Sequence, residues 1–144
     1  MVILFIHTFG VRVYKSSLDN ISKKEYNELM FDVEYYELPN GEKPVKTFID
    51  NLDVKMRAKA LGSIDILAEF GNKLREPYSK AMGKGLFELR IRFAGDITRI
   101  FYFFFVGNKI ILTNGFVKKT QKTPLIEVIT ARLYKADYER RHGK

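Results

Sequence analysis

The sequence contains no cysteine, and its two histidines, His7 and His142, lie at opposite ends of the chain. Without thiols there can be no disulfide and no thiolate metal site, and two isolated imidazoles cannot build a histidine cluster. We therefore expect no metal and no other cofactor. There is also no Ser-His-Asp set, no glycine-rich phosphate loop and no carboxylate pair placed for acid–base catalysis, so the common hydrolase mechanisms have little support.

Long hydrophobic runs are absent as well. The longest candidate, Ile100–Val106, stops at Gly107 and is far shorter than the roughly 20 residues that a membrane span needs. The apolar N-terminus, Met1–Phe9, has no basic leader and is not followed by a small-residue cleavage site of the secretory type. We expect a cytoplasmic protein with no membrane partner.

What the sequence does have is enough apolar residues for one core and a strongly uneven charge. The chain has 144 residues, a hydrophobic content of 46% and a net charge of +8, which predicts a single ordinary domain. Residues 30–54 carry six acidic against two basic side chains, whereas residues 84–144 carry thirteen basic against five acidic. Such a basic half fits a polyanionic partner, because neutralised phosphates release counterions. Charge alone fits a solvated basic face equally well.

The hydrophobic pattern predicts several strands. Phe31–Leu38 is rich in aromatic and β-branched residues and ends at a Pro-Asn-Gly turn. Leu86–Phe93 alternates strictly, Ile97–Val106 is almost wholly apolar, and Lys109–Phe116 follows a Gly-Asn turn. These last three segments predict an antiparallel meander with a buried central strand. Met1–Val13 could add a strand or a hairpin arm.

Three helices are expected. Pro44 suits the first turn of a short helix that runs through Leu52, and Asp53 caps a second helix, Val54–Phe70, that Gly71 ends. Thr123 and Pro124 are the expected cap and first residue of a final helix. That helix has an apolar stripe formed by Ile126, Ile129, Leu133 and Ala136. The fold class is therefore α+β, an antiparallel sheet with an N-terminal helical hairpin and a C-terminal helix packed on it.

The residues with chemical potential are cations. Arg90 and Arg92 share the polar face of one predicted strand, and Arg99 lies in the apolar strand that follows. A buried guanidinium needs a partner, so Arg99 either forms an internal ion pair with Glu88 or Asp96 or reaches a cleft. The other cations fit either a solvated surface or a phosphate site. They include the lysines that follow the last strand: Lys118, Lys119 and Lys122.

If these cations converge on one phosphate, RNA cleavage without a metal is feasible. It needs attack by a 2′-hydroxyl, stabilisation of the phosphorane charge and a proton for the departing 5′ oxygen. Arginine stays protonated, so a lysine of lowered pKa, a tyrosine or a substrate group must move the protons. Tyr102 lies on the strand face opposite Arg99, which favours a core position. Tyr134 and Tyr138 fit packing or partner contact, and the nearby phenylalanines fit the core: Phe101, Phe103, Phe104 and Phe105.

Three segments carry a family resemblance. Residues 86–91 (LFELRI), 98–102 (TRIFY) and 111–120 (ILTNGFVKKT), followed by the helix from Thr123, resemble the RelE/HigB toxin superfamily, and most closely its phage-derived HigB-like branch. The resemblance covers Phe31 to about Gly143. It implies a RelE-like fold and the toxin of a type II toxin–antitoxin system, a ribosome-dependent mRNA endonuclease. Its implied partners are mRNA on the ribosome and a cognate helix-turn-helix, HigA-like antitoxin.

By motif position, the resemblance implies an active cleft lined by Arg90, Arg92, Arg99 and Lys118 or Lys119. We expect Arg90, Arg99, Lys118 and Lys119 to be catalytic, and Arg92, Lys84 and Lys122 to bind RNA. Two features depart from the family. RelE has a catalytic tyrosine near the start of the last helix, where this chain has Leu125, Ile126 and Val128. Some HigB proteins use a histidine near the cleft, and here His142 lies in the tail.

Family members commonly begin at the strand that matches Phe31. We therefore expect a toxin domain over residues 30–144 and an extension over residues 1–29, with translation starting naturally at Met30. The alternative is a genuine added strand, and N-terminal sequencing of the native product would distinguish them. Two other functions stay open. A ParE-like DNA gyrase poison shares the fold but needs no phosphate-binding cations, and a degenerate, non-catalytic antitoxin-binding protein fits the absent tyrosine.

Overall fold

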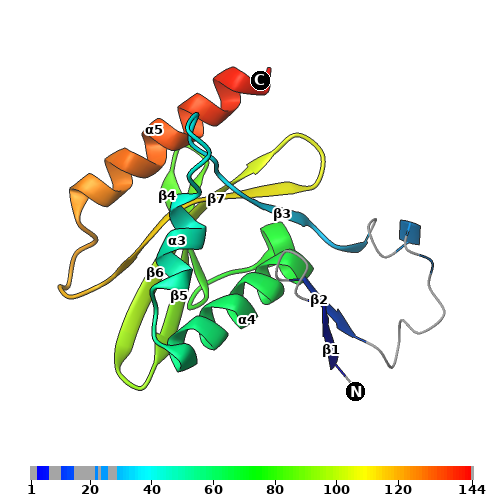
Figure 1. Cartoon of the computed structure of the whole chain (residues 1–144), viewed down its shortest axis with the longest axis horizontal. Helices are drawn as coiled ribbons and strands as arrows, with labels where there is room; N and C mark the ends of the chain where they lie inside the picture. Colours follow the sequence, from blue (N-terminus) through cyan, green and yellow to red (C-terminus); the bar gives the residue numbers. More distant parts are fainter. Residues whose placement is uncertain (1–2, 7–10, 15–21, 23, 26–28, 144) are drawn as a thin grey trace.

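The computed structural model describes residues 3–6, 11–14, 22, 24–25 and 29–143, and its centre is a five-stranded sheet (Figure 1). The strands follow the order β3-β7-β6-β5-β4, and neighbours are antiparallel except for the parallel pair β3 and β7. Their bounds are β3 Asp32–Tyr35, β4 Ser79–Gly83, β5 Leu86–Phe93, β6 Asp96–Phe105 and β7 Lys109–Val117. The predicted α+β fold and its three-stranded meander are confirmed, and the sheet is mixed because of the single parallel pair.

Helices cover both faces of this sheet (Figure 1). The helices α3 (Pro44–Asp50) and α4 (Val54–Phe70) lie on one face, and α5 (Leu125–Arg141) lies on the other. The predicted starts of the first two are confirmed, since α3 has proline in its first turn and the Asp53 carboxylate accepts the Met56 N–H at 2.9 Å.

The N-terminal strands form a separate unit. β1 (Ile3–Ile6) and β2 (Val11–Tyr14) pair antiparallel in a two-stranded sheet of their own, and this hairpin lies beside α4 (Figure 1). A hairpin was one of the two expectations for this segment. Most of residues 15–28 lie outside the described residues. The boundary at residue 30 and the start of translation at Met30 therefore stay predictions.

The alternation of the strands divides the core into two layers. Leu89 on β5 and Ile100 and Tyr102 on β6 pack under α3 and α4, while Phe101 and Phe103 on β6 pack under α5. All five are at most 1% exposed, and each buried side chain of this size contributes about 1.5–3 kcal/mol of transfer free energy. The core positions predicted for Tyr102, Phe101 and Phe103 are confirmed, and Phe104 and Phe105 are half-buried.

The packed face of α5 differs from the predicted one. The expected apolar stripe is exposed, with 66% of Ile126 and 64% of Leu133 accessible, and the helix instead packs through Ala131 and Tyr138. Tyr134 is also on the packed side and stacks on Tyr36 with ring centroids 4.5 Å apart. A tyrosine buries a large ring while its hydroxyl reaches a polar partner, which explains why this face displaces the aliphatic one. The packing role predicted for the two tyrosines is thus confirmed.

The start of α5 was also predicted incorrectly. Its N-cap residue is Pro124, which makes no side-chain capping hydrogen bond, and the Thr123 hydroxyl instead donates to the Glu88 carboxylate at 3.0 Å. A buried carboxylate is the stronger acceptor, because a charged partner roughly doubles the strength of a hydrogen bond. This contact ties the segment before α5 to β5.

Two buried tyrosines should make the fold sensitive to high pH. Burial, followed by the hydrogen bond to Asp137, raises the pKa of Tyr36 to about 12, and burial with the negative charge of Glu34 raises the pKa of Tyr138 to about 12. In the unfolded chain a tyrosine titrates near 10. Their contribution to stability is therefore complete below pH 10 and is lost as the pH rises towards 12. Urea unfolding between pH 9 and 12 should show this fall. The variants Tyr36→Phe and Tyr138→Phe should flatten it, and an unchanged slope in both would contradict the assignment.

The glycine that ends α4 should resist substitution. Gly71 has a φ of +52°, and an added Cβ would lie 2.0 Å from the Phe31 ring. We expect Gly71→Ala to lower the free energy of unfolding by about 3 kcal/mol, through both backbone strain and overpacking. Gly83→Ala is the matched control, since its φ is +90° and nothing lies within 4 Å of the added carbon. Backbone strain alone should cost about 1 kcal/mol there. Equal losses in the two variants would remove the packing argument.

Candidate nucleic-acid interface

Three of the predicted cations, Arg90, Arg99 and Lys118, meet on the α5 side of the sheet, where β5, β6 and β7 lie together. Arg90 on β5 and Arg99 on β6 are directly opposite each other in the antiparallel register. Lys118 directly follows β7 and is held to β6 by its backbone N–H, which donates to the Ile97 carbonyl at 2.8 Å. Like charges directly opposite each other destabilise a strand pair. The arrangement therefore needs a compensating anion.

Glu88 is that anion. Its side chain is 1% exposed, and its Oε1 lies 3.2 Å from Arg90 Nε and 3.1 Å from Arg99 Nε. Its Oε2 accepts the Thr123 hydroxyl. Of the two internal partners considered for Arg99, Glu88 is therefore the one that the structure shows. One carboxylate between two guanidinium groups neutralises only part of their charge, so the ion pair is compatible with a phosphate site.

Arg99 retains unused hydrogen-bonding capacity although it is 2% exposed. The contact between its Nε and Glu88 is ionic, because the N–H bond does not meet hydrogen-bond geometry, and its Nη1 has no hydrogen-bond partner within the described part of the chain. An unsatisfied buried donor costs about 1–3 kcal/mol, and more when it is charged. Burial, then the charges of Arg90 and Arg92, lower the pKa of Arg99, yet arginine remains charged at neutral pH. The Nε and Nη1 atoms are both shielded from solvent, so a phosphate could reach them only if the side chains that cover them moved aside.

Lys118 lies near several other cations. Desolvation and the positive charges of Arg99, Arg90 and Lys80 lower the pKa of Lys118, against the opposing effect of Glu88. Lys80 was not among the predicted residues. It lies on β4 directly opposite Glu88 in the register, and β4 itself was not predicted. The sequence signal for β4 was the segment Gly83-Lys84-Gly85, because glycines between two short segments favour a hairpin turn, and such a turn would have indicated a strand before β5.

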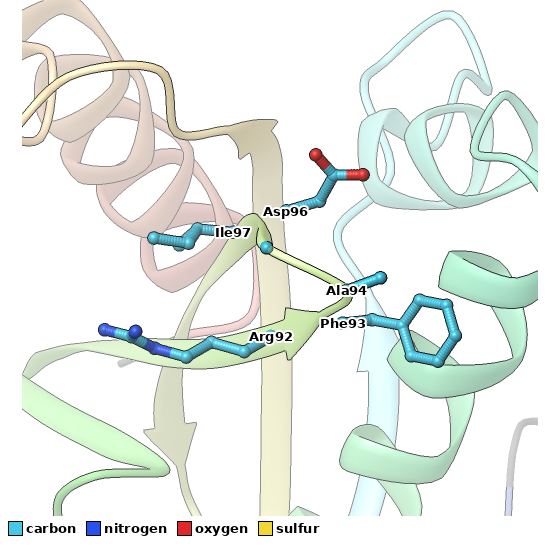
Figure 2. Close-up of a pocket in the computed structure, with 6 residues that line it drawn as sticks. Arg92, Phe93, Ala94, Asp96 and Ile97 are labelled. Carbon is cyan, nitrogen blue, oxygen red and sulfur yellow. The ribbon is translucent and has the colours of Figure 1, made fainter.

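The other four predicted residues lie outside this group of contacts. Arg92 and Ile97 point to the same side of the β5–β6 hairpin and Phe93 points to the other (Figure 2), around a hollow of about 200 Å³ at its tip. Lys119 and Lys122 are exposed on the segment that leads from β7 to α5. Lys84 lies in the turn between β4 and β5, at the opposite end of β5 from Arg92, so the structure does not bring it to the cluster.

We call the group of Arg90, Arg99, Lys118, Lys80 and Glu88 the cation cluster. Four positive charges around one carboxylate favour binding of a phosphate, and buried donors act more strongly than they would in water. The cluster has no obvious second acid–base group. Tyr102 lies on the other face of the sheet with its hydroxyl hydrogen-bonded to Ser79, and the first turn of α5 contains no tyrosine. Lysine is the residue type in the cluster that can exchange a proton near neutral pH when its pKa is lowered.

Two further properties of the described residues bear on function. No three His, Cys, Asp or Glu side chains among them are grouped to hold a metal ion. None of the helices that the structure describes is long and apolar enough to cross a membrane.

A comparison of the sequence with known protein families gives its family. The family model described as "Phage derived protein Gp49-like (DUF891)" matches residues 47–135, from α3 to the middle of α5. The match covers more than half of the chain and includes β4 to β7, which carry the cation cluster. None of the curated proteins matched the sequence. This family is RelE-like and toxin-like. The chain therefore belongs to the phage-derived Gp49-like family.

Proposed function

We propose that this chain is the HigB-like toxin of a type II toxin–antitoxin system and cuts mRNA on the ribosome in the cytoplasm. The observation that carries the proposal is Arg99, which is buried beside Glu88 and has guanidinium donors that no described group accepts. Membership of a toxin-like family supports the same function. The cognate antitoxin would be a helix-turn-helix protein of the HigA type.

In the proposed reaction, the 2′-hydroxyl oxygen attacks the adjacent phosphorus and the bond from phosphorus to the 5′ oxygen breaks. Arg90 and Arg99 stabilise the negative charge that develops on the phosphorane oxygens. Lys118 donates the proton that the departing 5′ oxygen needs, because its lowered pKa makes it a better acid than an ordinary lysine. The proton of the 2′-hydroxyl passes to a non-bridging phosphate oxygen of the substrate. The products are a 2′,3′-cyclic phosphate and a free 5′-hydroxyl.

Brief expression followed by mapping of new mRNA 5′ ends tests this function. We expect cuts within translated codons, in phase with the reading frame, that disappear when translation initiation is blocked. Intact messages with gyrase-linked DNA breaks would overturn the proposal in favour of a ParE-like poison. Intact messages and intact DNA, with the folded protein present, would identify a non-catalytic protein.

Lys80 provides a more specific test of the role given to Lys118. Its positive charge lowers the pKa of Lys118, so Lys80→Gln should raise that pKa and shift the alkaline limb of the cleavage profile to higher pH. The pH dependence of cleavage on purified ribosomes measures this. Lys84→Gln is the matched control, because Lys84 lies in the turn after β4, away from Lys118, and should leave the profile in place. A profile unmoved by Lys80→Gln would contradict the proton transfer by Lys118.

A further inference from the structure

The side of α5 that faces away from the sheet carries a continuous row of large aliphatic side chains. Leu125, Ile126, Ile129 and Leu133 are 72%, 66%, 43% and 64% exposed, respectively. Their spacing places them along one side of the helix, opposite Ala131 and Tyr138, which pack on the sheet. We call these four residues the outer stripe. Single exposed apolar residues are ordinary, whereas a contiguous row is typical of an interaction surface.

Positive charge borders the outer stripe at both ends. Lys122 is exposed just before the helix, and Arg140 continues the line of the stripe with 73% of its side chain accessible. Arg140 pairs with Asp137, but Asp137 is shared with Arg141, so one carboxylate serves two cations.

The other two acidic side chains of α5 do not offset this charge because each already has a partner. Glu127 accepts from the Asn114 amide and Glu139 pairs with Lys135. The surface therefore combines an apolar ridge with basic ends.

This charge pattern disfavours a second copy of the chain as the partner that covers the outer stripe. An antiparallel pair of α5 helices that overlaps the segment Ile126–Ala136 would bring Arg140 of each copy towards the end of the other helix that Lys122 precedes. A parallel pair would place Arg140 beside Arg140. Both arrangements oppose like charges at the edge of the contact, which costs affinity and suppresses pairing.

We propose that the outer stripe binds an amphipathic helix of another protein, one whose apolar ridge is flanked by aspartate or glutamate. Leu125 to Arg140 spans about 23 Å at the usual rise per residue, so about four turns of a partner helix would cover the stripe and reach Arg140, and a further turn would extend towards Lys122. Residues at i, i+3, i+4 and i+7 of the partner would interdigitate with the four aliphatic side chains. This inference uses none of the residues in the cation cluster and does not depend on nuclease activity.

Two synthetic 18-residue helical peptides test the inference. Both carry the same leucine ridge, one is flanked by glutamate and the other by lysine, and binding to the full-length chain is measured by fluorescence anisotropy. We expect the glutamate peptide to bind at least tenfold more tightly than the lysine peptide. Leu133→Ser should weaken that binding at least tenfold, and Arg140→Glu should reduce the preference for glutamate.

Val54→Ser is the matched control, because Val54 is 75% exposed on α4 and should leave binding unchanged. Circular dichroism establishes that each variant is folded. Binding of the glutamate peptide that Leu133→Ser does not weaken would overturn the proposal, since the peptide would then bind elsewhere on a basic protein. Absence of binding, or equal affinity for both peptides, would also overturn it. Dimerisation in sedimentation that Leu133→Ser abolishes would replace the proposed partner with a second copy.

Discussion

Arg99→Lys is expected to lower mRNA cleavage by about 100-fold or more while the protein stays folded. Lysine keeps a positive charge beside the buried Glu88 carboxylate, which lies 3.1 Å from Arg99 Nε, so the negative charge of Glu88 stays balanced. It loses the planar guanidinium, whose fixed fork of donors can bind two phosphate oxygens at once, and a lysine ammonium cannot reproduce that geometry. Primer extension on messages bound to purified ribosomes measures the rate, and urea unfolding measures stability.

Arg132→Lys is the matched control for this substitution. Arg132 lies on α5 and donates to the carbonyls of Gly83 and Met82, away from the cation cluster. It should leave cleavage within about twofold of the unsubstituted protein. Undiminished cleavage by a folded Arg99→Lys protein would count decisively against the phosphate-binding role, and equal losses in both variants would indicate a general effect on the fold. Arg99→Ala is the poorer test, because it leaves Glu88 with less compensation and destabilises the core.

Glu88→Gln is expected to lower the free energy of unfolding by about 3 kcal/mol. The substitution removes the negative charge between Arg90 and Arg99, which then face each other across the strands without a counterion. Breaking a buried ion pair in this way typically costs about 3–5 kcal/mol. We expect a loss at the lower end of this range because the glutamine side-chain oxygen can still accept the hydrogen bond from Thr123. Urea unfolding at neutral pH should show a lower midpoint with an unchanged slope.

Glu42→Gln is the comparison for this change, because Glu42 is exposed in the turn before α3. Substitutions at such sites usually alter stability by less than about 0.5 kcal/mol. If Glu88→Gln were as mild as Glu42→Gln, the two arginines would not depend on Glu88. Added inorganic phosphate should partly restore the stability of Glu88→Gln, since an anion bound to the folded state shifts the equilibrium towards it.

The fold could be predicted well where the pattern of residues had one interpretation. The strict alternation of residues 86–93 placed Glu88, Arg90 and Arg92 on one face of β5, and the structure confirms it. Asp53 at the start of α4 and Gly71 at its end were found for the same reason, since capping and positive φ select few residue types. β4 was missed because Ser79–Gly83 is short and lacks an alternating pattern.

α5 shows why one helix can be predicted and still be oriented wrongly. Its sequence has an aliphatic stripe and a tyrosine stripe, and periodicity gives no preference between two amphipathic faces. The choice depends on partners far away in the chain: Tyr36 for Tyr134, and Glu34, Phe103 and Phe105 for Tyr138. The same choice left the outer stripe exposed.

By itself, the sequence determined the α+β class, the order of the meander and the presence of a cationic set, because these depend on local periodicity and residue type. Only the tertiary structure decided that Arg90 lies opposite Arg99, that Glu88 lies between them, and that Lys80 and Thr123 join the same site. Those contacts depend on strand register and on packing between distant segments. Neither property is encoded in a local pattern, because one residue of slip would turn every side chain of a strand to its other face.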